Sequence, residues 1–273
     1  MIKISLKTIF CLLFFSQLFS IHSALAGTGD TLKKLHDMRI TSYTILGDYY
    51  MFSGLEGDSR YSRDMNSGMS TFEAKLAEIT KELGSTEDLA GIVSNWQFYR
   101  SLIETNRSDF LSQGYANARL VGELEQKVIA LNNSLSQAYS SLIESTNFPV
   151  SKWTQTTRDM SLIIITLTAE YSARGTSSMG QIMTIHINGE GMEHQAKVFA
   201  KHLSELKTAP GQTPAIAKSI DQVGVKWVFI EKSVANYNKN SVPFIVNSYG
   251  DRISQNLESI GNHYSASRQA KSQ

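Results

Sequence analysis

The segment VGELEQKVIALNNSLSQAYSSL, residues 121–142, decides the fold class. Its apolar residues recur at alternating spacings of three and four over three heptads: Val121, Leu124, Val128, Leu131, Leu135, Ala138 and Leu142. This spacing puts them along one side of an α-helix, and the other faces carry charged and amide side chains. We therefore predict an amphipathic helix that packs in a helical bundle.

Two other segments repeat this pattern, one early and one late in the chain. The first comprises Leu35, Met38, Ser42, Ile45, Tyr49 and Phe52, and the second Val246, Tyr249, Ile253, Leu257, Ile260 and Tyr264. Glycine and proline signals interrupt the helical patterns at 54–58, 84–86, 114, 147–149, 175, 210–214 and 243. They leave eight helical segments, four on each side of Pro149, and we predict an all-α fold.

One stretch favours a different secondary structure. Residues 162–168, LIIITLT, are rich in β-branched side chains and would suit a buried strand. The following segment, 169–173, continues without a turn signal. We therefore predict a buried helix here, although a short apolar run does not separate the two by periodicity.

The two halves of the chain look like copies of one unit. Seven identities over 39 positions share an offset of 122, beginning with Asp37-Met38 and Asp159-Met160. Trp96 and Trp227 each precede a Phe by two positions but lie 131 apart, and the 210–214 loop would hold the nine extra residues. We predict two tandem antiparallel four-helix bundles, residues 27–148 and 149–273, that arose by internal duplication.

Residues 1–26 have the features of a secretory signal peptide. Lys3 and Lys7 precede a short apolar stretch, and Ala24-Leu25-Ala26 is a small-x-small cleavage site before Gly27. Polar residues interrupt the segment, whereas a membrane anchor needs about 20 predominantly apolar residues. We predict a periplasmic or secreted protein that begins near Gly27 and has no transmembrane segment.

The composition of the chain argues against several classes of partner and site. Of 26 basic residues two lie in the leader, which has no acidic residue, so the mature chain has 24 basic and 25 acidic residues. A net charge of about −1 argues against a nucleic-acid partner. Cys11 is the single cysteine and lies in the leader, so we expect no disulfide and no cysteine-ligated metal in the mature protein.

The chain contains no common enzyme signature. A nucleophile elbow, a phosphate loop and a dinucleotide fingerprint are all missing from the sequence, so we expect neither an enzyme nor a cofactor. His186, Glu190 and His194 have a spacing that could bind zinc or copper on one helical face. Two glycines weaken that helix, and we interpret the three residues as a solvated face rather than a metal site.

Two aromatic pairs could be stacking platforms for a ligand. They are Trp96 with Phe98 and Trp227 with Phe229. Because both halves of the chain contain such a pair, packing in the bundle core is the favoured interpretation.

Arg39 is the main candidate for ligand binding. It follows the buried-face position Met38, so its stem can pack at the edge of the apolar stripe while its guanidinium reaches a neighbouring helix or a second subunit. Ser42 and Tyr43 lie one turn further along as secondary donors. A guanidinium presents a planar fork of donors to a small oxyanion. The alternative is an ordinary surface arginine paired with Asp37 or Asp48.

Short motifs resemble a known sensor module. The segment Arg39-Ile40-Thr41-Ser42-Tyr43 resembles the Arg-x-x-Ser-Tyr core of the periplasmic helix in nitrate/nitrite sensor kinases, and residues 96–100, WQFYR, look like a stretch further along that module. The same module forms the N-terminal region of type IV pili methyl-accepting chemotaxis transducers. The resemblance covers residues 31–110 and, more faintly, 153–240. It implies a helical bundle in which the arginine binds an anion at a dimer interface.

The chain also departs from that family. We expect no transmembrane helix or signalling domain after the bundles, and Ser161 stands where the second copy would need the arginine, although Arg158 is near. We expect an exported sensor-like protein that binds a small anion or a partner, such as a membrane receptor or envelope protein, with a homodimer as an option. The alternative is a structural or interaction protein of the envelope, pilus or extracellular matrix that has no small-molecule ligand.

Overall fold

The computed structural model describes residues 6–176, 191–237 and 241–271, which form eight α-helices and no strand. The predicted all-α fold is confirmed. Residues 162–168 lie within a helix, as predicted. The helices are α1 (Leu6–Gly54), α2 (Ser59–Leu83), α3 (Glu87–Gln113), α4 (Ala118–Thr146), α5 (Lys152–Thr176), α6 (Met192–Lys207), α7 (Pro214–Ala235) and α8 (Pro243–Lys271).

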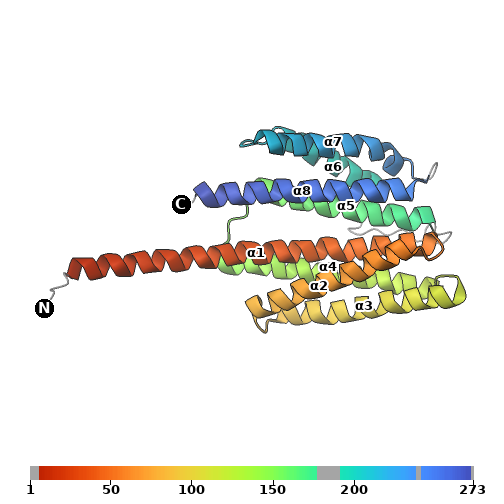
Figure 1. The fold of residues 1–273 in the computed structure, drawn as a ribbon, viewed down its shortest axis with the longest axis horizontal. Helices are drawn as coiled ribbons and strands as arrows, with labels where there is room; N and C mark the ends of the chain where they lie inside the picture. The colour runs from red at the N-terminus through yellow and green to blue at the C-terminus, as the bar shows by residue number, and fades with distance from the viewer. Residues whose placement is uncertain (1–5, 177–190, 238–240, 272–273) are drawn as a thin grey trace.

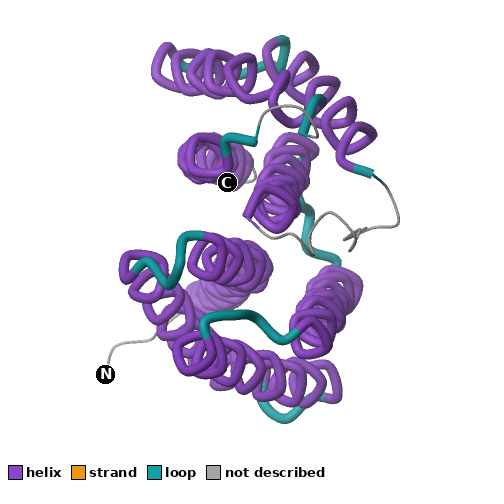
Figure 2. The backbone as a smooth tube through the Cα atoms, turned by 90° about the vertical axis from the view of Figure 1, so that its right-hand side faces the viewer, coloured by secondary structure: helices purple, strands orange, loops and turns teal. Residues whose placement is uncertain are grey.

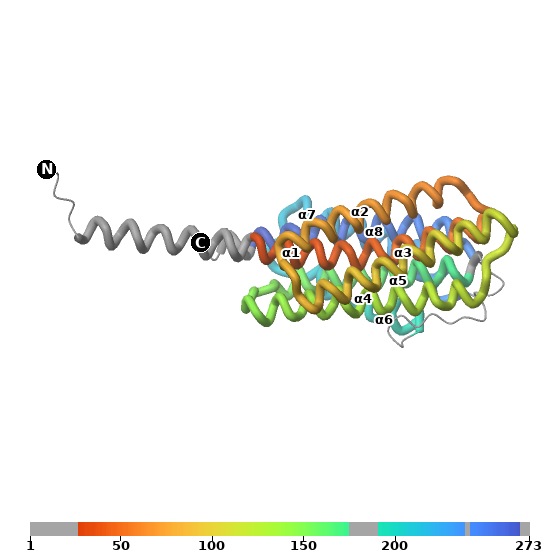
Figure 3. Tube along the Cα trace, turned by 90° about the horizontal axis from the view of Figure 1, so that it is seen from below, coloured from red at the N-terminus to blue at the C-terminus, as the bar shows by residue number. Residues whose placement is uncertain are grey.

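The helices form two antiparallel four-helix bundles that lie side by side (Figures 1 and 2). In the first bundle α1 packs against α2 and α4, and α3 packs against α4; Figure 3 shows α2 and α4 on opposite sides of α1. In the second, α5 packs against α6 and α8, and α7 packs against α6 and α8. The bundles meet where α1 contacts α5, so one continuous apolar core runs through both.

Local capping signals begin and end the helices at the predicted breaks. The Thr86 side chain accepts a hydrogen bond from the Leu89 N–H at the start of α3, and Thr213 caps α7 in the same way ahead of Pro214. Gly114 and Asn147 adopt left-handed backbone conformations at the ends of α3 and α4. These caps turn the chain back on itself through short loops, which makes neighbouring helices antiparallel.

The predicted buried faces are buried. On α4, six of the seven seam positions are buried, and Leu131 and Leu135 are fully enclosed. Trp96 and Trp227 are also buried, and each contacts a phenylalanine of the preceding helix: Phe72 stacks on Trp96 with ring centroids 3.9 Å apart, and Phe199 lies 4.4 Å from Trp227. The same aromatic contact therefore joins the second and third helices of both bundles.

This correspondence changes the alignment of the two halves. Phe72 and Phe199 are 127 apart, whereas the match at offset 122 continues into α2 as far as Lys75, and the tryptophans are 131 apart. The nine extra residues would therefore be divided between two loops rather than placed in the 210–214 loop alone. Internal duplication stays a prediction.

The core assignment of Phe98 and Phe229 is wrong. Their side chains are 58% and 60% exposed. Two residues after a buried tryptophan, a helix has turned by about 200°, so these side chains point away from the core. The ammonium of Lys127 lies 5.0 Å from the Phe98 ring centroid, and Phe229 stacks on Tyr249.

Close approach between α5 and α8 explains the threonines of α5. A Cβ added to Gly250 would lie 2.2 Å from Thr168 Oγ1, and one added to Gly261 would lie 2.7 Å from Thr157 Oγ1. The two glycines are eleven positions apart on α8, and the two threonines are eleven positions apart on α5. The two glycine–threonine contacts therefore fix the antiparallel register of these helices. The β-branched character of α5 thus serves helix packing rather than a sheet.

None of the helices described here is long and apolar enough to cross a membrane. Helix α1 begins at Leu6, so it includes most of the segment that we predict to be a signal peptide. Cleavage after Ala26 stays a prediction.

Candidate functional site

Arg39 lies where α1 packs against α4 and α5. Its side chain is partly buried, and its Nε atom is enclosed without a hydrogen-bond partner among the described residues. Burial lowers the pKa of the guanidinium, and the nearby Tyr43, Asp159 and Tyr139 partly offset this effect. Arginine remains protonated in proteins, so Arg39 is a fixed positive charge between the two bundles.

A chain of hydrogen bonds connects α4 and α5 beside Arg39. The Arg158 guanidinium donates to the Tyr139 hydroxyl (2.8 Å), which donates to Gln155 Oε1 (2.8 Å). Gln155 Nε2 donates in turn to Asp159 Oδ1 (2.8 Å). Arg39 is not part of this chain. We call the whole group the Arg39 cluster: Arg39, Tyr43, Tyr139, Gln155, Arg158 and Asp159.

Positive charge dominates the α1 side of this cluster. His36, one turn before Arg39, is buried, and burial followed by Arg158, Arg39 and Lys33 lowers its pKa well below the ordinary value. Three cations thus act on one imidazole, which stays neutral at neutral pH. Asp159 is the nearby carboxylate; burial raises its pKa, and the Gln155 hydrogen bond, His202, Arg39 and Arg158 oppose that rise.

The three predicted site residues do not act as one group. Tyr43 is buried close to Arg39. Ser42 instead faces the core of the first bundle, where its hydroxyl donates to the Arg39 carbonyl (2.9 Å) and accepts from Asn132 Nδ2 (2.7 Å). The hydroxyl of Ser42 is therefore used inside the fold.

Neither Asp37 nor Asp48 forms the ion pair with Arg39 that the alternative interpretation required. Asp37 Oδ2 binds Lys33 at 2.8 Å and Lys75 at 2.9 Å. Asp48 is nine residues, or about two and a half helical turns, after Arg39, so it lies on the opposite face of α1, in the groove described next. The interpretation of Arg39 as a surface arginine paired with Asp37 or Asp48 is wrong.

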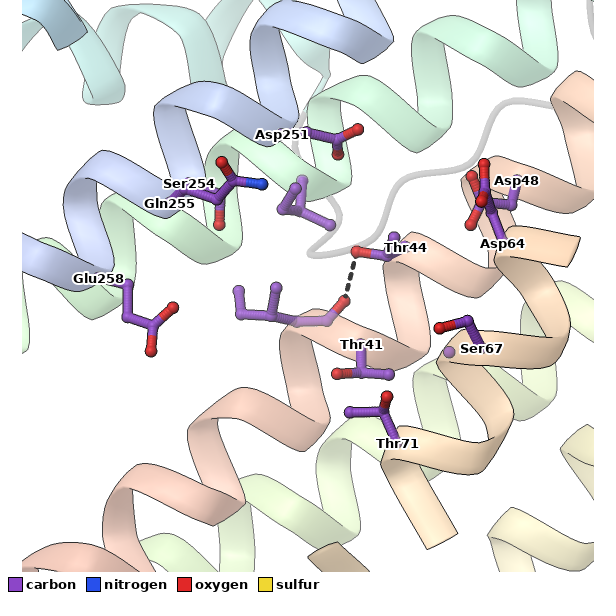
Figure 4. Close-up of a pocket in the computed structure, with 13 residues that line it drawn as sticks. Thr41, Thr44, Asp48, Asp64, Ser67, Thr71, Asp251, Ser254, Gln255 and Glu258 are labelled. Carbon is purple, nitrogen blue, oxygen red and sulfur yellow. Dashed lines mark hydrogen bonds between the residues drawn. The ribbon is translucent and has the colours of Figure 1, made fainter. Parts of the chain in front are cut away.

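A groove of about 490 Å³ opens on the other side of α1, between α1, α2, α5 and α8. Figure 4 shows Asp48 and Asp64 close together at one end, Asp251 across from them, and Glu258 at the far end. We call this the acidic groove. Its lining residues are Ile40, Thr41, Thr44, Asp48, Asp64, Ser67, Gly68, Thr71, Ile165, Asp251, Ser254, Gln255 and Glu258.

The carboxylates of the acidic groove disfavour one another's charge. Burial, then Asp251 and Asp64, raise the pKa of Asp48 well above its ordinary value. Burial and Asp64 raise the pKa of Asp251 to about 6. Burial penalises the charged forms of Asp48 and Asp251, and like charges nearby add to the penalty. The lining of the groove thus contains four acidic side chains and no basic one.

Most of the predicted His186, Glu190 and His194 group falls outside the part of the chain that the structure describes. His186 and Glu190 lie outside the described residues, and His194 is in the first turn of α6. Within the described ranges, no group of three or more His, Cys, Asp or Glu side chains is placed to hold a metal ion.

Sequence reasoning missed the acidic groove because its residues come from four helices. One local signal was available: Asp48 interrupts an apolar run from Ile45 to Phe52, and a charged residue inside such a run is unusual unless it is paired or functional. No protein-family model, curated protein or solved structure matches this chain.

Proposed function

We propose that this is an exported, non-enzymatic binding protein that holds a small anion at the Arg39 cluster. The observation that carries the proposal is the buried Nε atom of Arg39, which has no hydrogen-bond partner among the residues that the structure describes. A buried donor without a partner costs about 1–3 kcal/mol, more when the group is charged. An oxyanion or carboxylate of a ligand would supply the missing acceptor and balance the surrounding positive charge.

The position of the cluster favours a sensor-like role. Arg39 and Tyr43 belong to the first bundle and Arg158 to the second, so an anion bound among them would touch both. Such a ligand would stabilise one arrangement of α1 against α5 over others, which is how binding is converted into a signal. The resemblance of residues 39–43 to sensor modules agrees with this role.

A thermal-shift comparison tests the anion site. Nitrate, phosphate, sulfate and small carboxylates are screened on the parent protein, Arg39→Gln and the control Arg119→Ala, which removes an exposed arginine of α4. A ligand that binds the folded state stabilises it by about 2.7 kcal/mol at a concentration one hundred times its Kd. We expect a raised melting temperature in the parent and the control, and none in Arg39→Gln.

Two outcomes would count against the anion site. Equal shifts in all three proteins would remove Arg39 from the site. The lack of any shift in the parent would favour the structural or interaction role instead.

Export is a separate part of the proposal. N-terminal sequencing of the protein recovered from the periplasm or medium should begin at or within a few residues of Gly27, because Ala24-Leu25-Ala26 fits a signal-peptidase site. A membrane-embedded product that retains Met1 would contradict it.

A further inference from the structure

Asp48 is a buried carboxylate without a partner. The residue is 6% exposed, and it has no hydrogen bond or ion pair in the part of the chain that the structure describes. It opens into the acidic groove, where Figure 4 shows it facing Asp64. A buried acid is kept either by a paired cation or by a raised pKa that leaves it neutral, and a cation bound in the groove would restore the ionised form.

The second bundle contains a buried acid at the corresponding position, and that acid is paired with a cation. Glu170 lies 122 positions after Asp48 and is fully buried on α5. Arg174, one turn later, forms an ion pair with it at 3.3 Å. The corresponding position after Asp48 is Phe52, which has no charge. The second bundle therefore supplies its own cation, whereas the first leaves its buried acid open to the groove.

Arg60 does not form an ion pair with Asp48. Its charge lowers the pKa of Asp48 from a distance, but its guanidinium lies over the rings of Tyr61 (4.5 Å) and Phe244 (5.0 Å). At the far end of the groove, Glu258 already binds Lys33 at 2.7 Å. The uncompensated negative charge is thus concentrated at the end formed by α1, α2 and α8.

The floor between these ends is rich in hydrogen-bond acceptors. Thr41 and Thr44 donate their hydroxyl protons to the carbonyls of Asp37 and Ile40, which leaves their oxygen lone pairs available as acceptors. Ser67, Thr71 and Ser254 add further hydroxyls. Carboxylates and hydroxyl oxygens together suit a ligand with several N–H donors.

We propose that the acidic groove binds a small aliphatic amine. Its ammonium group lies between Asp48, Asp64 and Asp251, and its carbon chain follows the hydroxyl-lined floor toward Glu258. The volume of the groove is in the range of small-molecule sites. A bare metal ion fits less well, because no three acidic or histidine side chains of the described residues are placed close enough together to hold one. This site is separate from the Arg39 cluster.

Calorimetric titration with 1,4-diaminobutane tests the proposal, using 1,4-butanediol as the uncharged probe of the same length and calcium chloride as the inorganic cation. At pH 7.5 and constant ionic strength, we expect the parent to bind the amine but not the diol, and calcium at least tenfold more weakly. Asp48→Asn and Asp251→Asn should each weaken amine binding at least tenfold. Glu144→Gln, which neutralises an exposed acid of α4, should bind like the parent.

Stability separates a binding role for Asp48 from a structural one. Because the folded state raises the pKa of Asp48, ionisation destabilises the fold as pH rises, and Asp48→Asn removes that cost. Without ligand, Asp48→Asn should therefore melt higher than the parent at pH 7.5, with a smaller difference at pH 4. The charged groups facing Asp48 are Asp64 and Arg60 of α2 and Asp251 of α8, while α5 contributes Ile165 to the lining.

Three results would overturn the amine site. They are a parent that does not bind 1,4-diaminobutane, an Asp48→Asn variant that binds it as tightly as the parent, and a parent that binds calcium as tightly as the amine. Arg39→Gln should leave amine binding unchanged, so failure of the anion site and failure of this one are distinguishable.

Discussion

Replacing Leu131 with alanine is expected to lower the free energy of unfolding by about 2–5 kcal/mol, because the change removes buried apolar surface and leaves a cavity. Leu131 is fully enclosed on the α4 face that packs into the first bundle. Denaturant unfolding followed by circular dichroism measures the loss from the transition midpoint.

The matched control is Leu111→Ala on α3, where the leucine side chain is 66% exposed. An exposed substitution of this kind should change stability by less than about 0.5 kcal/mol. Similar effects at Leu111 and Leu131 would contradict the assignment of α4 to the core.

Gly250→Ala should also destabilise the protein, by about 1–3 kcal/mol, although alanine is the better helix former. The added methyl group would lie 2.2 Å from Thr168 Oγ1. That hydroxyl donates to the Ile164 carbonyl, and a β-branched side chain has few other rotamers. The clash must therefore move α8 away from α5.

A double-mutant cycle with Thr168→Ala isolates this contact. The pair Gly250→Ala with Thr168→Ala should be more stable than Gly250→Ala alone, because the second change removes the atoms in the way. If Gly250→Ala is as stable as the parent, or if Thr168→Ala gives no rescue, the close approach of α5 and α8 is wrong.

The sequence predicts the helices well because their signals are local. The spacing of Val121 through Leu142 depends on one helix alone, and the caps at Thr86, Gly114 and Thr213 act within a few residues. The strand-like run 162–168 was correctly assigned to a helix, but the physical reason, contact of Thr168 with Gly250, is visible only in the structure.

The candidate sites are harder to predict because they depend on how the bundles meet. The pattern identifies Ser42 and Tyr43 as neighbours of Arg39 in sequence, yet it does not tell which side of α1 meets α4 and α5 and which meets α2 and α8. One clue was present. From Ile45 to Phe52 every residue of α1 is buried, and a helix that is apolar nearly all round must be enclosed by more than its own bundle.

Buried charges without partners on two sides of α1 are the basis of the functional account. Within the described residues, Arg39 lacks an acceptor at Nε, and Asp48, which is 6% exposed, has no cation paired with it. Natural proteins keep such unfavourable groups mainly where a function needs them, because substitution would otherwise stabilise the fold. The two groups have opposite charge and lie on different faces, so their ligands should be of opposite charge as well.

A single thermal-shift screen tests the claim that α1 presents two ligand sites. The parent, Arg39→Gln and Asp48→Asn are each melted with the anions and with 1,4-diaminobutane at pH 7.5. We predict that the anion shift disappears only in Arg39→Gln and the amine shift only in Asp48→Asn. If neither ligand class raises the melting temperature of the parent, or if the two variants respond alike to both classes, the account is contradicted.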